Sequence, residues 1–279
     1  MSRHDEPILL LGASGRLGRI LRSAWPASAP PLHALSRAGG PGLQAWSPGD
    51  SIDALPRVGS VVALWGVVPG ATRSLSENAA LASAAMDLGA QLGANRVLHA
   101  SSAAVYRPGA HALSELEPAD PVSAYGSAKR DMERAARTWR GGAGPQAVCL
   151  RIGNVAGAES LFGAMAGQDH VTLDRFPDGQ GPRRSYLATT DLARAIAALA
   201  TAPQEDLPDL VNLAAPRPTA MADIARAAGR EVRWREAPPS AVPLVALDTA
   251  RLETVIALGD AAAEPVHLVE DARRHAGFQ

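Results

Sequence analysis

Short runs of consecutive apolar residues recur through the first half of the chain, and each is followed by a turn or by a stretch with helical spacing. Because these runs do not alternate between apolar and polar positions, we expect strands that are covered on both faces of a sheet. The runs occupy residues 8–11, 32–35, 60–65, 96–100 and 147–152. Helix-like stretches such as SENAALASAAMDLGAQLG separate them. This order predicts an α/β protein with a doubly wound parallel sheet.

The pattern loosens after residue 155 into segments rich in glycine and proline. A helix at 189–200, a short strand at 210–215 and a second helix at 219–228 interrupt these segments. We interpret residues 1–155 as the main α/β domain. Residues 156–279 would form a smaller C-terminal substrate-binding lobe packed on it.

Charge and cysteine content narrow the classes of partner. The chain has 28 acidic and 27 basic residues and an isoelectric point near 6.7, so no excess charge favours nucleic acid or an anionic membrane, and a small-molecule substrate is expected. The single cysteine, Cys149, lies in the apolar run AVCL and is expected in the core of a protein from a reducing compartment. Without a secretory signal or an apolar run long enough to span a bilayer, a cytoplasmic location is expected.

The first apolar run leads into the sequence GASGRLG, which places three glycines between a strand and a helix. Such glycines permit a tight turn and a close approach of the backbone to a pyrophosphate at the helix N-terminus. The motif therefore predicts that residues 1–155 form a dinucleotide-binding Rossmann domain. The residues expected to contact the cofactor here are Gly12, Ser14, Gly15, Arg16, Leu17 and Gly18.

The end of the second predicted strand bears on the choice of cofactor. A carboxylate at this place usually accepts hydrogen bonds from the ribose hydroxyls of NAD. Here the sequence has Ser36 and Arg37 instead. A hydroxyl and a guanidinium suit a 2′-phosphate, so NADP is expected in preference to NAD.

Lys129 is the only lysine among the 27 basic residues, and Tyr125 precedes it by four positions. On a helix this spacing places both side chains on the same face. A phenol with a free pKa of about 10 needs help to exchange protons near neutral pH, and a neighbouring ammonium lowers that pKa. Ser101 and Ser102 follow the strand at 96–100, at the sheet edge where ligands bind in open α/β folds. We expect these four residues to lie together.

Five motifs, in this order along the chain, resemble the extended short-chain dehydrogenase/reductases, in the NAD-dependent epimerase/dehydratase family. They are GASGRLG, SSAAVY (101–106), YGSAK (125–129), RIGNVAG (151–157) and RRSYLATTDLARAI (183–196). The resemblance covers residues 7–230. It implies that the catalytic serine, tyrosine and lysine of the family are Ser102, Tyr125 and Lys129. It implies further that the helix asparagine of many members is Asn78, and that Asn154 lines the substrate side of the cofactor pocket. The remaining residues expected along the cofactor are Leu64, Trp65, Gly66, Ala100 and Ile152.

The resemblance implies an enzyme that transfers a hydride at an alcohol or ketone carbon. Tyr125 would be the acid/base, Lys129 would lower its pKa and bind the nicotinamide ribose, and Ser102 would hold the substrate oxygen. Simple carbonyl reduction and sugar epimerisation both stay open. A regulatory protein that senses NADP without catalysis is the alternative, and the intact Ser, Tyr and Lys set argues against it. The resemblance also implies a homodimer formed through helices that include the Tyr125 helix.

Three departures from the family restrict the reaction. Dehydratases of the family usually follow the catalytic hydroxyl with Asp-Glu, whereas Ala103 and Ala104 follow Ser102, so dehydration is not expected. Arg107 replaces a glycine that often follows the Val-Tyr pair, and the substrate lobe is short, which argues against a full nucleotide-sugar site. The arginines that could still bind a diphosphate are Arg183, Arg184, Arg217 and Arg251.

Overall fold

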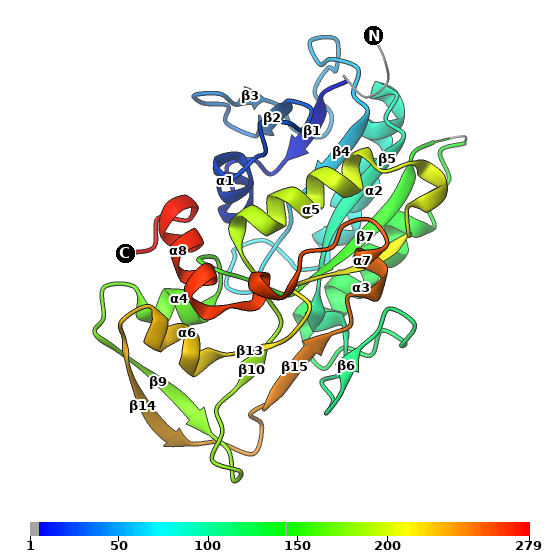
Figure 1. Cartoon of the computed structure of the whole chain (residues 1–279). Helices are drawn as coiled ribbons and strands as arrows, with labels where there is room; N and C mark the ends of the chain where they lie inside the picture. Colours follow the sequence, from blue (N-terminus) through cyan, green and yellow to red (C-terminus); the bar gives the residue numbers. More distant parts are fainter. Residues whose placement is uncertain (1–5, 143) are drawn as a thin grey trace.

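The computed structural model describes residues 6–142 and 144–279, and a parallel sheet with helices on both faces forms its centre (Figure 1). Among the described residues, seven parallel strands lie in the spatial order β12 (Leu210–Leu213), β7 (Gln146–Ile152), β5 (Arg96–Ser102), β4 (Ser60–Ala63), β1 (Ile8–Leu11), β2 (Leu32–Ser36) and β3 (Gln44–Ala45). Every residue of β1, β4 and β12 is buried. The two-sided burial explains the continuous apolar runs and confirms the predicted fold class.

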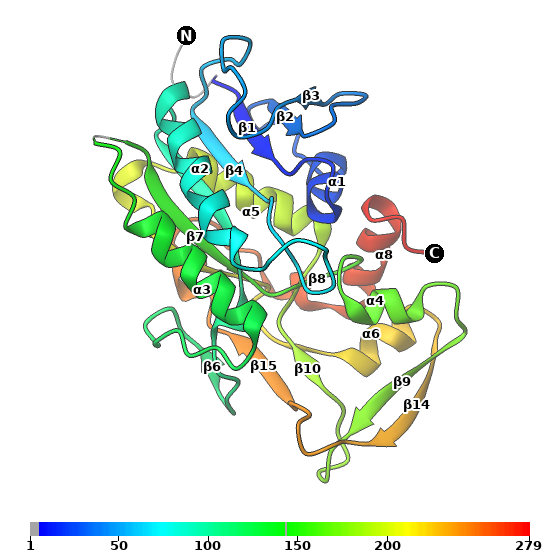
Figure 2. The ribbon, with the colours of Figure 1, turned by 180° about the vertical axis from the view of Figure 1, so that it is seen from behind.

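Two pairs of helices cover the faces of the sheet. α2 (Glu77–Leu92) and α3 (Ala124–Arg137) pack side by side on the face seen in Figure 2. α1 (Arg16–Ser23) and α5 (Thr189–Thr201) cover the face seen in Figure 1. Gly89 lets α2 lie close to the sheet, because a Cβ there would be 2.8 Å from Cγ2 of Val97.

α5 and β12 belong to the central layers although both follow residue 155. β12 pairs with β7 in parallel, with Leu210 opposite Cys149, and α5 packs on β4 and β5. The Ser60 hydroxyl on β4 donates to the carbonyl of Ala200 on α5 at 2.6 Å. The expected division at residue 155 therefore does not coincide with the sheet. Without β12, β7 would be an apolar edge strand. The chain leaves the central sheet after β7 and returns to it at β12.

The remaining elements are small sheets and short helices, and several of them surround a second core that contains Phe162, Tyr186 and Leu268. The small sheets pair β8 (Asn154–Val155) with β11 (Tyr186–Leu187), pair β9 (His170–Arg175) with β14 (Glu231–Glu236), and join β13 (Thr219–Ala220), β10 (Arg183–Arg184), β15 (Leu244–Leu247) and β6 (Ala112–Leu113). The helices are α4 (Ser160–Met165), α6 (Met221–Ala227), α7 (Ala250–Glu253) and α8 (Pro265–His275). The β9–β14 ribbon extends away from the central sheet (Figure 1).

α8 is tied to the central layer through α5. Ala188 at the start of α5 has no side chain that could cap the helix, and Asp271 of α8 supplies the missing acceptor. Its carboxylate accepts hydrogen bonds from the backbone N–H of Thr190 at 2.7 Å and from the Thr189 hydroxyl. None of the helices within residues 6–142 and 144–279 combines the length and the apolar character that a membrane crossing requires.

Candidate active site

The glycine motif forms a close-packed turn between β1 and α1. Gly12 has a φ of +80°, and a Cβ there would lie 2.6 Å from the backbone nitrogen of Trp65. A Cβ on Gly18 would lie 2.3 Å from the carbonyl oxygen of Gly12. These two positions therefore require glycine. Leu17 packs against the main core, so α1 is fixed on the sheet directly after the turn.

The tip of the same turn suits an anionic cofactor. Ser14, Gly15 and Arg16 are exposed, and Gly15 at the start of α1 provides no side chain to cap the helix. The first N–H groups of α1 thus have no partner within the helix and carry the positive end of its dipole. Arg16 lies beside them and donates to the carbonyl of Ala158 at 2.9 Å. A dinucleotide pyrophosphate fits this arrangement of donors.

The end of β2 provides less for a 2′-phosphate than expected. Ser36 is buried, and its hydroxyl donates to the carbonyl of Gly39 at 3.2 Å. Its hydrogen is therefore committed to the turn that follows β2. Arg37 is exposed at the same strand end and is the one member of the expected pair that projects into solvent.

The segment after β4 lies next to both the glycine turn and α3. Leu64, Trp65 and Gly66 follow the strand directly, and the Trp65 backbone touches the Gly12 turn. A Cβ on Gly66 would lie 2.8 Å from Oδ1 of Asn78 and 3.4 Å from Nζ of Lys129. The backbone at Gly66 therefore connects the glycine turn with the lysine.

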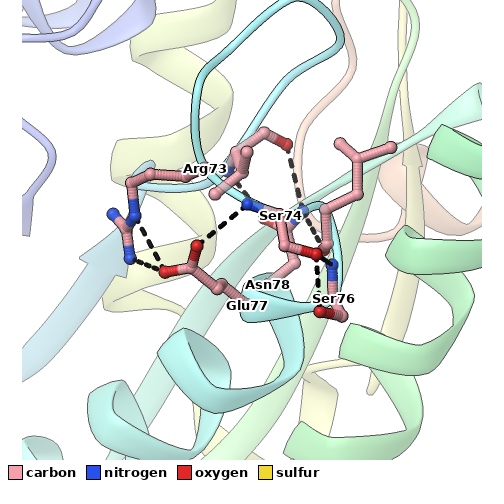
Figure 3. A network of polar contacts seen from close by, with 7 residues as sticks. Arg73, Ser74, Ser76, Glu77 and Asn78 are labelled. Carbon is pink, nitrogen blue, oxygen red and sulfur yellow. Dashed lines mark hydrogen bonds and ion pairs between the residues drawn. The ribbon is translucent and has the colours of Figure 1, made fainter.

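Asn78 shapes the loop that follows this segment. Its side-chain Nδ2 donates to the carbonyls of Val67 at 3.0 Å and Leu75 at 2.9 Å, and its Oδ1 accepts the Val67 N–H at 2.9 Å. All these bonds are to backbone groups, so Asn78 closes the loop of residues 67–75. Figure 3 shows this network together with Glu77, which accepts hydrogen bonds from Arg73 and from the Ser74 N–H.

Ser102, Tyr125 and Lys129 meet at the carboxyl end of β5. Lys129 is buried with 5% of its surface exposed, and its ammonium donates to the carbonyl of Ala100 at 2.7 Å. Its Nζ lies 5.8 Å from the centroid of the Tyr125 ring. Ser102 ends β5, where its Oγ accepts the N–H of Ala104 at 3.2 Å. The three side chains thus lie together as the spacing predicted.

Burial shifts the pKa values of Tyr125 and Lys129 in the directions that favour their neutral forms. Burial raises the pKa of Tyr125, and a hydrogen bond with Ser102 lowers it in part. The Lys129 ammonium donates to the Ala100 carbonyl and lies beside the Tyr125 ring, and its lowering of the Tyr125 pKa stays a prediction. Burial also lowers the pKa of Lys129 from 10.5 to about 8, and Glu133 opposes that shift.

Residues beyond β7 close the far side of the site. Ile152 is buried at the strand end, and Asn154 starts β8 opposite Tyr186 of β11. Of the four arginines considered for a diphosphate, Arg217 is ion-paired with Glu264, and Arg183 and Arg251 donate to the carbonyls of Pro218 and Leu210. Arg184 is half-buried and donates to the carbonyl of Val242 at 2.8 Å. Within the described residues it pairs with no carboxylate.

Two features of the site escaped sequence reasoning. Trp46 stacks on Trp65, with ring centroids 6.3 Å apart, beside the segment that follows β4. Glu133 and Arg151 form a buried ion pair beside Ser101. The signal for Glu133 was present in the sequence, because it follows Lys129 at the same four-residue spacing that separates Tyr125 from Lys129.

The model of the NAD dependent epimerase/dehydratase family matches residues 68–214, just over half of the chain. Comparison with curated protein sequences gives no match.

Solved structures share the fold over nearly the whole chain. A UDP-glucuronic acid 4-epimerase from Bacillus cereus, in complex with UDP-4-deoxy-4-fluoro-glucuronic acid and NAD, has a TM-score of 0.78 at 16% identity and covers 98% of this chain and 100% of its own. MoeE5, in complex with UDP-glucuronic acid and NAD, has a TM-score of 0.76 at 22% identity, covering 96% and 99%. A Thermus thermophilus UDP-glucose 4-epimerase in complex with NAD has a TM-score of 0.73 at 19% identity, covering 96% and 99%. These three structures contain NAD, so they do not support the expectation of NADP.

Proposed function

Because the chain belongs to the NAD-dependent epimerase/dehydratase family, we propose that it is an oxidoreductase or epimerase that transfers a hydride at an alcohol or ketone carbon of a nucleotide sugar. The observation that carries the proposal is the meeting of Ser102, Tyr125 and Lys129 at the carboxyl edge of the sheet, beside the glycine turn. That edge is where open α/β sheets bind their ligands.

Each residue of the set has a distinct task in this proposal. Tyr125, which is half-buried, takes the proton from the substrate hydroxyl in oxidation, or gives it to the substrate oxygen in ketone reduction. Ser102 orients the substrate oxygen and stabilises the tyrosinate through its hydrogen bond. Lys129 provides a positive charge under the cofactor ribose. The nicotinamide ring supplies the position that accepts and returns the hydride.

A nucleotide sugar is supported by the substrate lobe. The alignments cover 99–100% of the three sugar-nucleotide-bound or epimerase chains, so the argument from a short lobe loses its basis. Arg184 supports a diphosphate, since its guanidinium has only carbonyl acceptors among the described residues. Dehydration stays outside the proposal, because Ala103 and Ala104 supply neither an acid nor a base.

NAD is the cofactor we propose, in place of NADP. The Ser36 hydroxyl bonds to Gly39 and not outward, which leaves Arg37 alone to recognise a 2′-phosphate. A single exposed guanidinium contributes little in water. The neighbouring structures with NAD agree with this choice.

Fluorescence titration with NADH and NADPH tests the cofactor. We expect NADH to bind at least as tightly as NADPH, and Arg37→Ala to change NADH affinity by less than about twofold, or 0.4 kcal/mol. Tenfold tighter binding of NADPH by the wild type, lost in Arg37→Ala, would show that the original expectation from Ser36 and Arg37 was right.

Turnover with a panel of UDP-sugars tests the reaction. The wild type should give a C4 epimer or a keto-sugar, and Tyr125→Phe should lower turnover by at least about a hundredfold with NADH affinity retained. Nucleotide that stays bound through purification and an epimer product indicate an epimerase. Free exchange and a keto product indicate a dehydrogenase. Full activity of Tyr125→Phe would refute the assigned role.

A further inference from the structure

A buried ionic cluster lies one helical turn beyond the proposed catalytic lysine. Glu133 on α3 and Arg151 on β7 are each 4% exposed in their side chains. Arg151 binds the carboxylate with two donors, Nε to Oε1 at 3.0 Å and Nη2 to Oε2 at 2.9 Å. The Ser101 hydroxyl donates to Oε1 of the same carboxylate at 2.5 Å. Glu133 therefore receives three hydrogen bonds from two neighbouring strands.

These bonds fix the strand end that carries the proposed catalytic residues. Ser101 lies between Ala100, whose carbonyl accepts the Lys129 ammonium, and Ser102. α3 is thus bonded to β5 at two successive turns, through Lys129 to Ala100 and through Glu133 to Ser101. The second contact sets the position of β5 relative to the helix, and so the position of Ser102 relative to Tyr125.

The cluster also sets the electrostatic surroundings of Lys129. The titratable groups around the lysine are Tyr125 and Glu133 on α3, His99 on β5 and Cys149 on β7, and Arg151 on β7 pairs with Glu133. Burial together with the charge of Lys129 lowers the pKa of His99 to about 3, and burial raises the pKa of Cys149, so both are neutral near pH 7. Glu133 is then the group in this set whose charge favours the ammonium form.

We propose that Glu133 is a positioning residue for the active site, which holds the end of β5 against α3 and keeps the buried Lys129 side chain in its ammonium form. Only the effect of Glu133 on catalysis rests on the proposed function. The burial, the bonds and the charges stand independently of any substrate. Arg151 serves this arrangement by holding the carboxylate with two donors.

The single lysine makes the protonation state of Lys129 directly measurable. Protein labelled with [ε-¹³C]lysine and expressed without lysine-containing tags gives one lysine resonance, that of Lys129. The pH titration of this resonance requires no substrate or cofactor. We expect Glu133→Gln, which keeps the shape of the side chain and removes its charge, to lower the titration midpoint by at least about one unit. Glu115→Gln is the matched control. Glu115 is also buried, but its carboxylate accepts the Asn212 N–H and does not shift the pKa of Lys129.

A second variant guards against a change that only destabilises the fold. Glu133→Gln leaves Arg151 buried without its partner, whereas Glu133→Gln combined with Arg151→Met removes both charges. We expect the double variant to recover the melting temperature and still titrate below the wild type. A midpoint equal to that of the wild type in either folded variant would overturn the proposal.

Turnover adds the catalytic consequence. If the proposed function holds, the basic limb of the pH–rate profile should move to lower pH in Glu133→Gln, and Glu133→Asp should restore part of it. A shifted lysine resonance in a protein that turns over no substrate would refute the proposed function and leave this inference intact. An unshifted lysine resonance in an active enzyme would refute this inference and leave the proposed function intact.

Discussion

At the scale of single residues, the site depends on side chains whose surroundings oppose the charge that their chemistry needs. Burial raises the pKa of Tyr125 and lowers the pKa of Lys129, so each is pushed toward its neutral form. Ser102 and Glu133 act against burial at these two positions. Part of this was predictable, because the four-residue spacing of Tyr125 and Lys129 is visible in the sequence.

The partners of these residues were harder to predict. Glu133 and Arg151 are 18 positions apart on different elements, and their pairing depends on how α3 lies across β7. Asn78 was named from the family resemblance, and its amide bonds to backbone groups 3 and 11 residues earlier in the chain. Such contacts follow from tertiary packing, which no local pattern encodes.

Ser102→Ala should move the pH dependence of alcohol oxidation. The hydrogen bond from Ser102 lowers the pKa of Tyr125, so its removal raises that pKa, and less tyrosinate is present at a given pH. We expect the acidic limb of the pH–rate profile to shift upward by about one unit. Loss of the bond to the Ala104 N–H should cost only about 1 kcal/mol of stability.

Ser83→Ala on α2 is the control for this variant. Its hydroxyl donates to the Ala79 carbonyl at 3.4 Å, within its own helix. The control should keep both the wild-type limb and the wild-type stability. If the acidic limb of the pH–rate profile did not shift in Ser102→Ala, the Ser102 hydroxyl would have no effect on the ionisation of Tyr125.

At the scale of the elements, strands buried along their whole length were predictable and partly exposed ones were not. The five apolar runs match β1, β2, β4, β5 and β7 within a few residues. The β9–β14 ribbon was missed. Its sequences HVTLDR and EVRWRE mix apolar and charged residues, and they pair in parallel across 61 positions with His170 opposite Glu231. Only the pairing makes them strands.

The close approach of α3 to the end of β5 depends on Gly126. A Cβ at this position would lie 2.0 Å from the carbonyl oxygen of Ala104, two residues after Ser102. Gly126→Ala must therefore push the start of α3, with Tyr125, away from the serine. We expect turnover to fall by at least about tenfold, because a displacement near 1 Å is costly in catalysis. Affinity for NADH should change less, since the glycine turn is elsewhere.

Gly163→Ala on α4 provides the comparison. A Cβ there meets no atom within 4 Å among the described residues, so this helical glycine has room for a methyl group. Stability should rise slightly and turnover should stay unchanged, as alanine favours the helix. If Gly126→Ala retained full turnover as well, the contact between α3 and the Ala104 segment would have no part in the alignment of Tyr125.

At the scale of the whole molecule, the fold encloses a charge that its stability does not require. The central sheet, α2 and α3 bury Lys129 to 5% exposure, and the sequence suggested this only through the rarity of lysine. Whether a helical residue is exposed or buried depends on how much of its helix is covered by neighbouring elements. Here α2 packs against α3, and the second turn of α3 directs its lysine inward, whereas the basic residues of its last turn are arginines.

Lys129→Met should therefore stabilise the protein while abolishing hydride transfer. Burial lowers the pKa of Lys129 from 10.5 to about 8, so the unfolded chain binds more protons than the folded one between these pH values. Below pH 8 the buried ammonium costs up to about 3 kcal/mol, and that cost disappears as the pH rises toward 10.5. Urea unfolding of both proteins should show the variant more stable at pH 7, with the difference shrinking toward pH 10. A variant less stable than the wild type at pH 7 would mean that the bond to Ala100 outweighs the burial of the charge, and that the lysine is retained for the fold.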